Sequence, residues 1–224
     1  MTIPEIVAHR GASRERPENT LAAFRRAVEL GADAVELDVH LTADGVVVVH
    51  HDPAIAGLGA IDALTLGQLS AHRVQGEPVP TLDEVFEAVG ERLRIYVELK
   101  GATVAPGSLD CIARHPSSPG AAVHCFDHRL VALARHLAPT VPRGVLEVSY
   151  PIDLTAAARP VEARDLWRHR DFVDEALVRG AHAEGRRVVA WTVNDAATMR
   201  RMAGWGVDAI CTDDVALARA TLGS

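Results

Sequence analysis

The sequence Ala-Val-Glu-Leu-Asp-Val-His-Leu at residues 34–41 alternates between apolar and polar side chains. Because successive side chains of a strand point to opposite faces, Glu36, Asp38 and His40 share one face and the larger apolar residues share the other. The apolar face of a barrel strand packs against surrounding helices, and two acids on the remaining face repel each other unless a cation neutralises them. The stretch therefore predicts a buried strand whose acidic face needs a cation.

Residues 95–100 repeat this pattern further along the chain, with Glu98 and Lys100 on one face. Three carboxylates from two strands make an oxygen-rich site that suits a hard cation such as Mg²⁺ or Ca²⁺. The alternatives are a solvent-facing polar side of an antiparallel sheet, or salt bridges with nearby arginines. Two such strands in one α/β pattern favour a metal site formed by Glu36, Asp38 and Glu98.

Strand-like and helix-like stretches alternate along the chain, which is typical of a parallel sheet with crossover helices. We expect strands at residues 6–10, 34–41, 95–100, 121–126, 144–147, 187–193 and 209–212, with an eighth near residues 157–161 where the pattern is weak. A complete (β/α)₈ barrel typically needs about 250 residues. The 224 residues are therefore expected to form one compact (β/α)₈ TIM-type barrel domain, residues 1–224, without a large inserted subdomain.

Local signals place several helices between these strands. Asn19 or Thr20 is expected to cap the first helix, and Thr81 with Glu84 forms a capping box for another. Further helices are expected at residues 130–137, 173–184 and 195–203. Residues 53–80 and 101–120 show no regular pattern, so we expect them to form loops over a site.

The composition excludes several classes of protein. Hydrophobic residues make up 48% and charged residues 24% of the chain, as in ordinary globular proteins. The net charge of −7 argues against a nucleic-acid partner. No apolar run approaches the roughly 20 residues of a transmembrane segment, and the first residues lack a signal-peptide pattern. With three scattered cysteines and no CxxC pair, we expect a cytoplasmic protein.

A hairpin signal at Asp44-Gly45 predicts where His51 lies. A two-residue loop would place His51 opposite Asp38, and a three-residue loop would place it opposite Leu37. In both registers His51 returns to the mouth of the barrel beside the acids, where a general acid or base is useful. His50 has the opposite parity, so we expect it to be exposed or packed against the rim.

Other candidate residues follow the ends of predicted strands. His9-Arg10-Gly11 closes the first strand, at the barrel face where such folds place their chemistry. Lys100 is the only lysine in the chain. We expect His40 and His124 to have structural roles, and Trp191 either to wall a pocket or to belong to the core.

Taken together, these segments resemble the glycerophosphodiester phosphodiesterase family. The resemblance spans nearly the whole chain in order. It is carried by His9-Arg10-Gly11, Pro17-Glu18-Asn19-Thr20, Glu36-Leu37-Asp38-Val39, Thr42-Ala43-Asp44-Gly45, His51-Asp52-Pro53, Pro80-Thr81-Leu82-Asp83-Glu84, Glu98-Leu99-Lys100, Trp191-Thr192-Val193-Asn194, Gly206-Val207-Asp208-Ala209 and Thr212-Asp213.

The resemblance implies a (β/α)₈ barrel that hydrolyses glycerophosphodiesters to glycerol 3-phosphate and an alcohol. It implies that one divalent cation, Mg²⁺ or Ca²⁺, binds Glu36, Asp38 and Glu98. It also implies that His9 and His51 are the general base and general acid, in either order, and that Arg10 and Lys100 contact the phosphate. The attacking group, a glycerol hydroxyl or water, the alcohol and the oligomeric state stay open. The expected partner is a small glycerophosphodiester.

The chain also departs from the family pattern. After His51-Asp52, Ile55 takes the place of a leucine, and Gly57 and Leu58 replace a polar run. His124 stands where a serine pair often precedes the phenylalanine. Two alternatives therefore accompany the leading hypothesis. One is a lysophospholipase D or phospholipase C-like enzyme with an apolar rim formed by Ala54, Ile55, Leu58 and Ile61. The other is a catalytically silent barrel that binds a phosphorylated metabolite.

Overall fold

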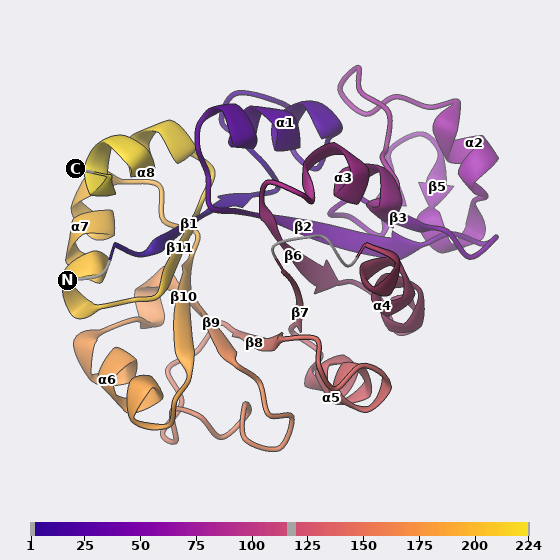
Figure 1. The fold of residues 1–224 in the computed structure, drawn as a ribbon. Helices are drawn as coiled ribbons and strands as arrows, with labels where there is room; N and C mark the ends of the chain where they lie inside the picture. Colours follow the sequence, from indigo (N-terminus) through magenta and orange to yellow (C-terminus); the bar gives the residue numbers. More distant parts are fainter. Residues whose placement is uncertain (1–2, 116–119, 224) are drawn as a thin grey trace.

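A closed barrel of parallel strands forms the centre of the structure, a computed structural model that describes residues 3–115 and 120–223 (Figure 1). Eight parallel strands in these residues pair in the order β1, β2, β6, β7, β8, β9, β10, β11 and then β1 again. They are β1 (Glu5–His9), β2 (Ala34–Leu41), β6 (Arg94–Leu99), β7 (Ala121–Cys125), β8 (Arg143–Glu147), β9 (Asp165–His169), β10 (Arg187–Trp191) and β11 (Ala209–Thr212). The predicted (β/α)₈ barrel is confirmed.

Helices surround the strands on the outside of the barrel, as Figure 1 shows. They are α1 (Leu21–Glu29), α3 (Leu82–Val89), α4 (Val104–Arg114), α5 (His128–Leu137), α6 (Glu175–Ala183), α7 (Ala196–Trp205) and α8 (Val215–Leu222). Thr20 caps α1, and Thr81 and Glu84 form the predicted capping box of α3. None of the helices in the described part of the chain combines the length and apolar character of a membrane span.

Two apolar layers follow from the alternation of side chains along the strands. The outward face of β2, with Val35, Leu37 and Val39, packs with the buried faces of the helices in the main core. The inward side chains form a second core that fills the barrel: Val7, Ala34, Tyr96, Ala122, Leu146, Trp167, Val189, Ala209 and Cys211. Because this inner core is closely packed, space for a ligand lies at an end of the barrel.

The eighth strand lies at Asp165–His169, so the expected position at residues 157–161 is wrong. Residues 157–161 form turns between β8 and β9. Asp165 and Arg168 are both buried in β9, where Arg168 pairs with Glu147 and Asp165 pairs with arginines. These buried charges interrupt the apolar pattern by which a strand is found in sequence.

Residues 104–114 form helix α4, so the expectation of a loop across residues 101–120 is wrong for that part. Residues 116–119 of the expected loop lie outside the described residues. Pro106, Gly107 and Ser108 are poor helix formers and conceal the helix in the sequence. Pro106 is tolerated because it lies in the first turn, where its missing N–H has no helical partner. The Ser108 hydroxyl donates to the Val104 carbonyl over 2.9 Å.

The predicted hairpin joins β2 to β3 (Val47–Val49) and adopts the three-residue register, with Val39 opposite Val49 and Leu41 opposite Val47.

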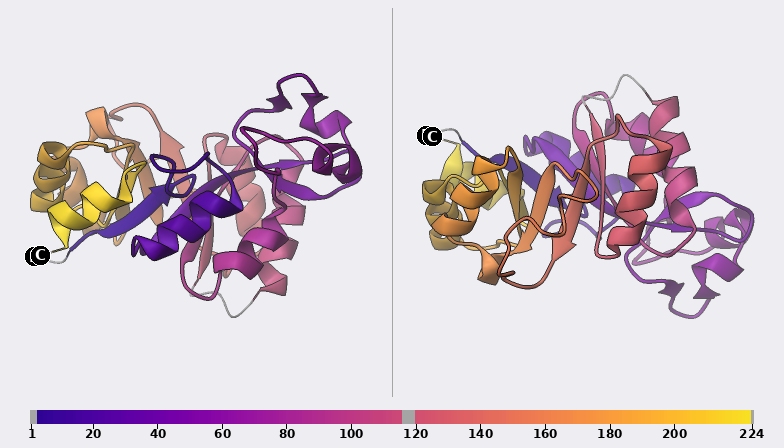
Figure 2. Two further views of the ribbon diagram at one scale, coloured as in Figure 1. Left: turned by 90° about the horizontal axis from the view of Figure 1, so that it is seen from above. Right: turned by 90° about the horizontal axis from the view of Figure 1, so that it is seen from below.

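The chain then makes an excursion, residues 50–80, before α3. It contains β4 (Ala54–Ile55), β5 (Gly59–Ala60), η1 (Ile61–Ala63) and α2 (Leu66–Ser70) around a small core of its own. Figure 2 shows this excursion standing out from the side of the barrel. A further 3₁₀ turn, η2 (Arg170–Phe172), follows β9.

Candidate active site

A cavity of about 90 Å³ opens at the carboxyl ends of the strands. Seven of the eight residues that sequence analysis assigned to the site line it: His9, Arg10, Glu36, His51, Glu98, Lys100 and Trp191. The eighth, Asp38, does not line it. The chain therefore brings residues from four strands and a hairpin to one place, as the sequence predicted.

Two buried carboxylates form the acidic part of this cavity. Parallel pairing places Glu98 beside both Asp38 of β2 and His124 of β7. Oxygens of Glu36 and Glu98 and a nitrogen of His124 all lie within 4.8 Å of one another. Burial and the nearby charge of Asp38 raise the pKa of Glu36 and of Glu98 to about 7. The group is a possible metal-binding cluster, because a bound cation would offset this cost of ionisation.

Asp38 is fully buried and is compensated by cations of the protein itself. Arg10 Nε lies 3.2 Å from Oδ2, and Lys100 Nζ lies 3.3 Å from Oδ1. Asn19 donates to Oδ2 over 2.9 Å. Burial opposes ionisation of Asp38, but Arg10 and Lys100 outweigh it and hold its pKa below the ordinary value. Lys100 also pairs with Glu98 over 2.6 Å.

His9 is oriented by Asp213, the residue that follows the last strand. Its Nδ1 lies 2.7 Å from Asp213 Oδ1, and its Nε2 lies 4.0 Å from Glu36 Oε2. Burial lowers the pKa of His9, but the hydrogen bond to Asp213 and the charge of Glu36 raise it above the ordinary value. Asn194 and Ser13 in turn donate to Asp213. With Nδ1 bound to Asp213, Nε2 is the ring nitrogen that faces Glu36.

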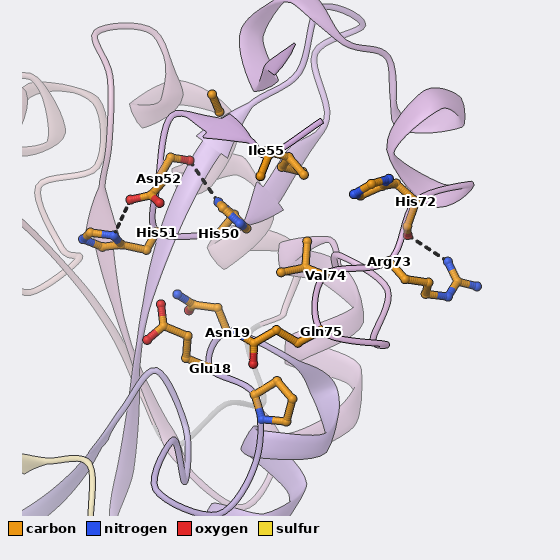
Figure 3. A pocket seen from close by; sticks show the side chains of 13 residues that line it. Glu18, Asn19, His50, His51, Asp52, Ile55, His72, Arg73, Val74 and Gln75 are labelled. Atoms are coloured by element: carbon orange, nitrogen blue, oxygen red, sulfur yellow. Dashed lines mark hydrogen bonds and ion pairs between the residues drawn. The ribbon is translucent and has the colours of Figure 1, made fainter. Parts of the chain in front are cut away.

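His51 borders more than one cavity. Its Nδ1 contacts Asp52 Oδ1 at 2.8 Å, and His40 Nε2 contacts its backbone oxygen at 3.1 Å. Besides the barrel cavity, His51 lines a second one of about 370 Å³ between the loop that holds Glu18 and the excursion (Figure 3). Figure 3 also shows two hydrogen bonds of Asp52. Its backbone oxygen contacts His50 Nδ1, and its carboxylate contacts His51 Nδ1. The expectation that His51 returns to the mouth is confirmed.

The backbone at Arg10 and Gly11 turns sharply from β1 towards α1. Arg10 has φ of 56° and Gly11 has φ of 82°. A Cβ at residue 11 would lie 2.7 Å from Ala23, so only glycine fits this close approach. The turn directs the Arg10 side chain to Asp38 and to Glu18, whose Oε1 accepts from Nη1 over 2.9 Å.

An aromatic wall closes one side of the barrel cavity. The Trp191 ring makes edge contacts with Phe126 and His169, at centroid distances of 5.7 and 5.3 Å. Trp191 is half-buried, and its Nε1 is buried without a hydrogen-bond partner. The structure therefore places Trp191 at the cavity wall as well as against the inner core.

Three residues at this site carried no catalytic or metal-binding assignment in the sequence analysis. Asn19 was considered as a helix cap, but its side chain bonds Asp38 and Thr20 is the cap. Asp213, which follows the last strand, holds His9. His124 was expected to be structural, yet it lines the cavity beside Glu98. A signal for His124 exists, since it is the polar residue on the inward face of an otherwise apolar strand.

Comparisons with known proteins agree with this geometry. Residues 9–217 match the model of the Glycerophosphoryl diester phosphodiesterase family. A glycerophosphodiester phosphodiesterase of Caldanaerobacter subterraneus subsp. tengcongensis is 34% identical over 93% of both chains.

Solved structures give the same result. The Oleispira antarctica phosphodiesterase in complex with the product sn-glycerol-3-phosphate superposes with a TM-score of 0.93, at 27% identity, over 99% of this chain and 98% of that chain. A glycerophosphodiester phosphodiesterase from Parabacteroides distasonis superposes with a TM-score of 0.88, at 26% identity, over 98% and 97% of the two chains. The chain thus belongs to the glycerophosphoryl diester phosphodiesterase family and is a phosphoric diester hydrolase.

Proposed function

We propose that this chain hydrolyses a glycerophosphodiester to glycerol 3-phosphate and an alcohol, with one divalent cation and with His9 and His51 as the general acid–base pair. The observation that carries the proposal is the convergence of His9 and His51 with the buried carboxylates of Glu36 and Glu98 on one cavity. The Oleispira antarctica relative, whose structure contains sn-glycerol-3-phosphate, supports this product.

We propose that Glu36, Asp38 and Glu98 hold the cation, Mg²⁺ or Ca²⁺. The donor set fits, because two acids with raised pKa values lie buried at the cavity and hard cations prefer carboxylate oxygens. When bound, the cation supplies positive charge that neutralises the non-bridging phosphate oxygens. Arg10 and Lys100 border the same cavity and can donate to these oxygens.

The two histidines have complementary surroundings for proton transfer. Asp213 fixes the ring of His9 and stabilises its protonated form, as the raised pKa indicates. Asp52 contacts Nδ1 of His51, which leaves Nε2 for the substrate. One imidazole accepts the proton of the attacking hydroxyl while the other protonates the leaving oxygen. Trp191 and Phe126 offer an apolar wall for the glycerol carbons.

The alcohol has room on the other side of His51. The 370 Å³ cavity in Figure 3 is bordered by Glu18 from the first loop and by His50, His72 and Arg73 from the excursion. Both cavities share His51, so a diester that spans them would present its scissile bond to this imidazole. We therefore propose the 370 Å³ cavity as the position of the alcohol.

A lipid diester is the second candidate, and exposed apolar residues favour it. Phe126, Val148, Tyr150 and Ile152 follow the neighbouring strands β7 and β8 at the carboxyl end, with 45%, 53%, 44% and 107% relative exposure. This surface is not the apolar rim that the sequence predicted within the excursion, because Ile55 and Ile61 are buried in the core of the excursion. A lysolipid chain would therefore lie along the β7–β8 side.

We further propose that residues 1–224 act as one domain in the cytoplasm. Buried, unpaired Cys111, Cys125 and Cys211 fit a reducing compartment. This part of the proposal is tested by fractionating cells that produce the protein.

Turnover of glycerophosphocholine and of bis(p-nitrophenyl) phosphate, measured with and without EDTA, tests the activity. We expect EDTA to abolish turnover and His51→Ala to lower kcat about 10²–10⁴-fold. His136→Ala, a change at an exposed residue of α5, should leave turnover unaltered. Turnover that is indifferent to EDTA and to His51→Ala contradicts the proposal, and turnover of lysophosphatidylcholine alone selects the lipid candidate. No turnover above the metal background supports the silent, metabolite-binding barrel.

A further inference from the structure

His124 lies in the acidic cluster without any role in the proposed function. It is 1% exposed and lines the barrel cavity with Glu36 and Glu98. Its Nε2 is 3.7 Å from Glu36 Oε1, and its Nδ1 is buried without a hydrogen-bond partner. An imidazole of this burial normally has a strong polar partner. The Nε2 atom thus faces the carboxylate of Glu36, and Glu98 completes a cluster whose ligand atoms lie within 4.8 Å of one another.

The ring of His124 is held in position by two aromatic neighbours. Trp167 of β9 stacks on it at a centroid distance of 4.1 Å with 5° between the planes. Tyr96 of β6 meets it edge-on at 6.5 Å. Trp167 reaches across β8 because Gly144, the strand partner of His124, has no side chain: a Cβ there would lie 2.7 Å from the indole. The imidazole is thus oriented before any ligand binds.

The distances in the cluster suit direct ligation of one ion. Metal–oxygen and metal–nitrogen bonds are about 2.0–2.3 Å, so two ligand atoms on one ion lie about 3–4.5 Å apart. The Nε2–Glu36 separation of 3.7 Å falls in this range. Asp38 lies beside Glu98 on the neighbouring strand and is held there by Arg10 and Lys100.

We infer that His124 is a nitrogen ligand of the proposed metal site and that it turns the preference of this site from Mg²⁺ and Ca²⁺ towards Mn²⁺ and Co²⁺. The inference rests on the metal site of the proposed function. Imidazole binds transition metals far better than it binds Mg²⁺ or Ca²⁺, while carboxylates accept both classes. His124 would then join Glu36, Asp38 and Glu98 around the ion, with Asp38 oriented by Arg10 and Lys100.

Electron spin-echo spectroscopy of the Mn²⁺-loaded, unmutated protein tests the inference directly, because it detects ¹⁴N nuclei bound to the ion. We expect ¹⁴N modulation in the wild type, its loss in His124→Gln and its retention in His128→Gln. His128 is a matched control: it is half-buried, and its Nε2 contacts the Leu146 carbonyl at 3.1 Å. Calorimetry should show Co²⁺ affinity falling about tenfold or more in His124→Gln, with Mg²⁺ affinity changing less than about threefold.

The outcomes separate this inference from the proposed function. Mn²⁺ binding without ¹⁴N modulation overturns the inference, even if the diester is hydrolysed, and this result needs no variant to fold. Modulation that persists in His124→Gln also overturns it and assigns the nitrogen to another histidine. Modulation that depends on His124 in a protein without diesterase turnover supports the inference and contradicts the proposed function.

Discussion

The two ends of the barrel both bury charges, but they balance them differently. At the amino end, Glu5 of β1 accepts from Arg94 over 2.7 Å and from Arg187 over 2.6 Å. Tyr96 donates to the same carboxylate over 3.0 Å, and Arg187 also pairs with Asp165 at 3.3 Å. Every one of these charges finds an opposite charge on another strand of the barrel. This end of the barrel is closed by its own ion pairs.

The carboxyl end has more acid than base. Asp38 and Glu98 share Lys100, and Asp38 also has Arg10. Within the described residues, Glu36 lies within 4.0 Å of imidazole nitrogens but of no Lys or Arg side-chain nitrogen. A paired network stabilises the fold, whereas uncompensated buried acids cost stability and leave a position that a cation can fill. Charge balance therefore distinguishes the structural end from the functional end.

The largest effect is expected when one of the excess acids at the carboxyl end is neutralised. We expect Glu36→Gln to lower kcat/KM about 10³-fold, or about 4 kcal/mol, because a carboxylate that attracts the cation is lost. The metal-free variant should melt at the same or a higher temperature than the wild type, because an uncompensated buried charge becomes neutral. Steady-state kinetics and calorimetric melting in EDTA measure the two effects. If Glu36→Gln loses as much stability as Glu5→Gln at the opposite end, the proposed difference between the ends is wrong.

The next effect concerns the closed end. We expect Arg187→Met to lower the free energy of unfolding by about 2–4 kcal/mol, because Glu5 and Asp165 lose a partner in a partly buried network. Urea denaturation measures the loss, and kcat of the folded variant should stay within about twofold of the wild type. Arg179→Met is the control, since its exposed pair with Glu175 contributes only about 0.3–0.5 kcal/mol. A variant with normal stability and poor turnover would show that the amino end serves catalysis.

The carboxyl end could be predicted from sequence because its signals are local. The alternation of side chains placed Glu36 and Asp38 on one face of their strand. Parallel pairing then sets Asp38 beside Glu98 of the next strand. The turn at Asp44-Gly45 limited His51 to two registers, both near the acids. The pairing of Asp38 with Arg10 and Lys100 could not be predicted because it depends on side-chain packing.

The amino end and strand β9 could not be predicted for a different reason. Glu5 and Arg187 are 182 positions apart, and nothing local in either segment indicates that they meet. In β9 the charges of Asp165 and Arg168 suggest exposure, although partners elsewhere in the fold bury both residues. The strand pattern marks His124 as a polar residue on an inward face, but its place beside Glu98 depends on the neighbouring strand Arg94–Leu99.

The smallest effect is expected at Tyr96, the residue that connects the two ends. Its hydroxyl bonds Glu5 at the closed end, while its ring contacts His124 near the cavity. Tyr96→Phe removes only the hydroxyl, so we expect a loss of about 1–2 kcal/mol in unfolding free energy and less than a twofold change in kcat/KM. Urea denaturation and kinetics on the same preparation measure both. Since the ring contact is retained, a large fall in turnover with little loss of stability would mean that the network around Glu5 controls the chemistry at the other end, and that the two ends do not act separately.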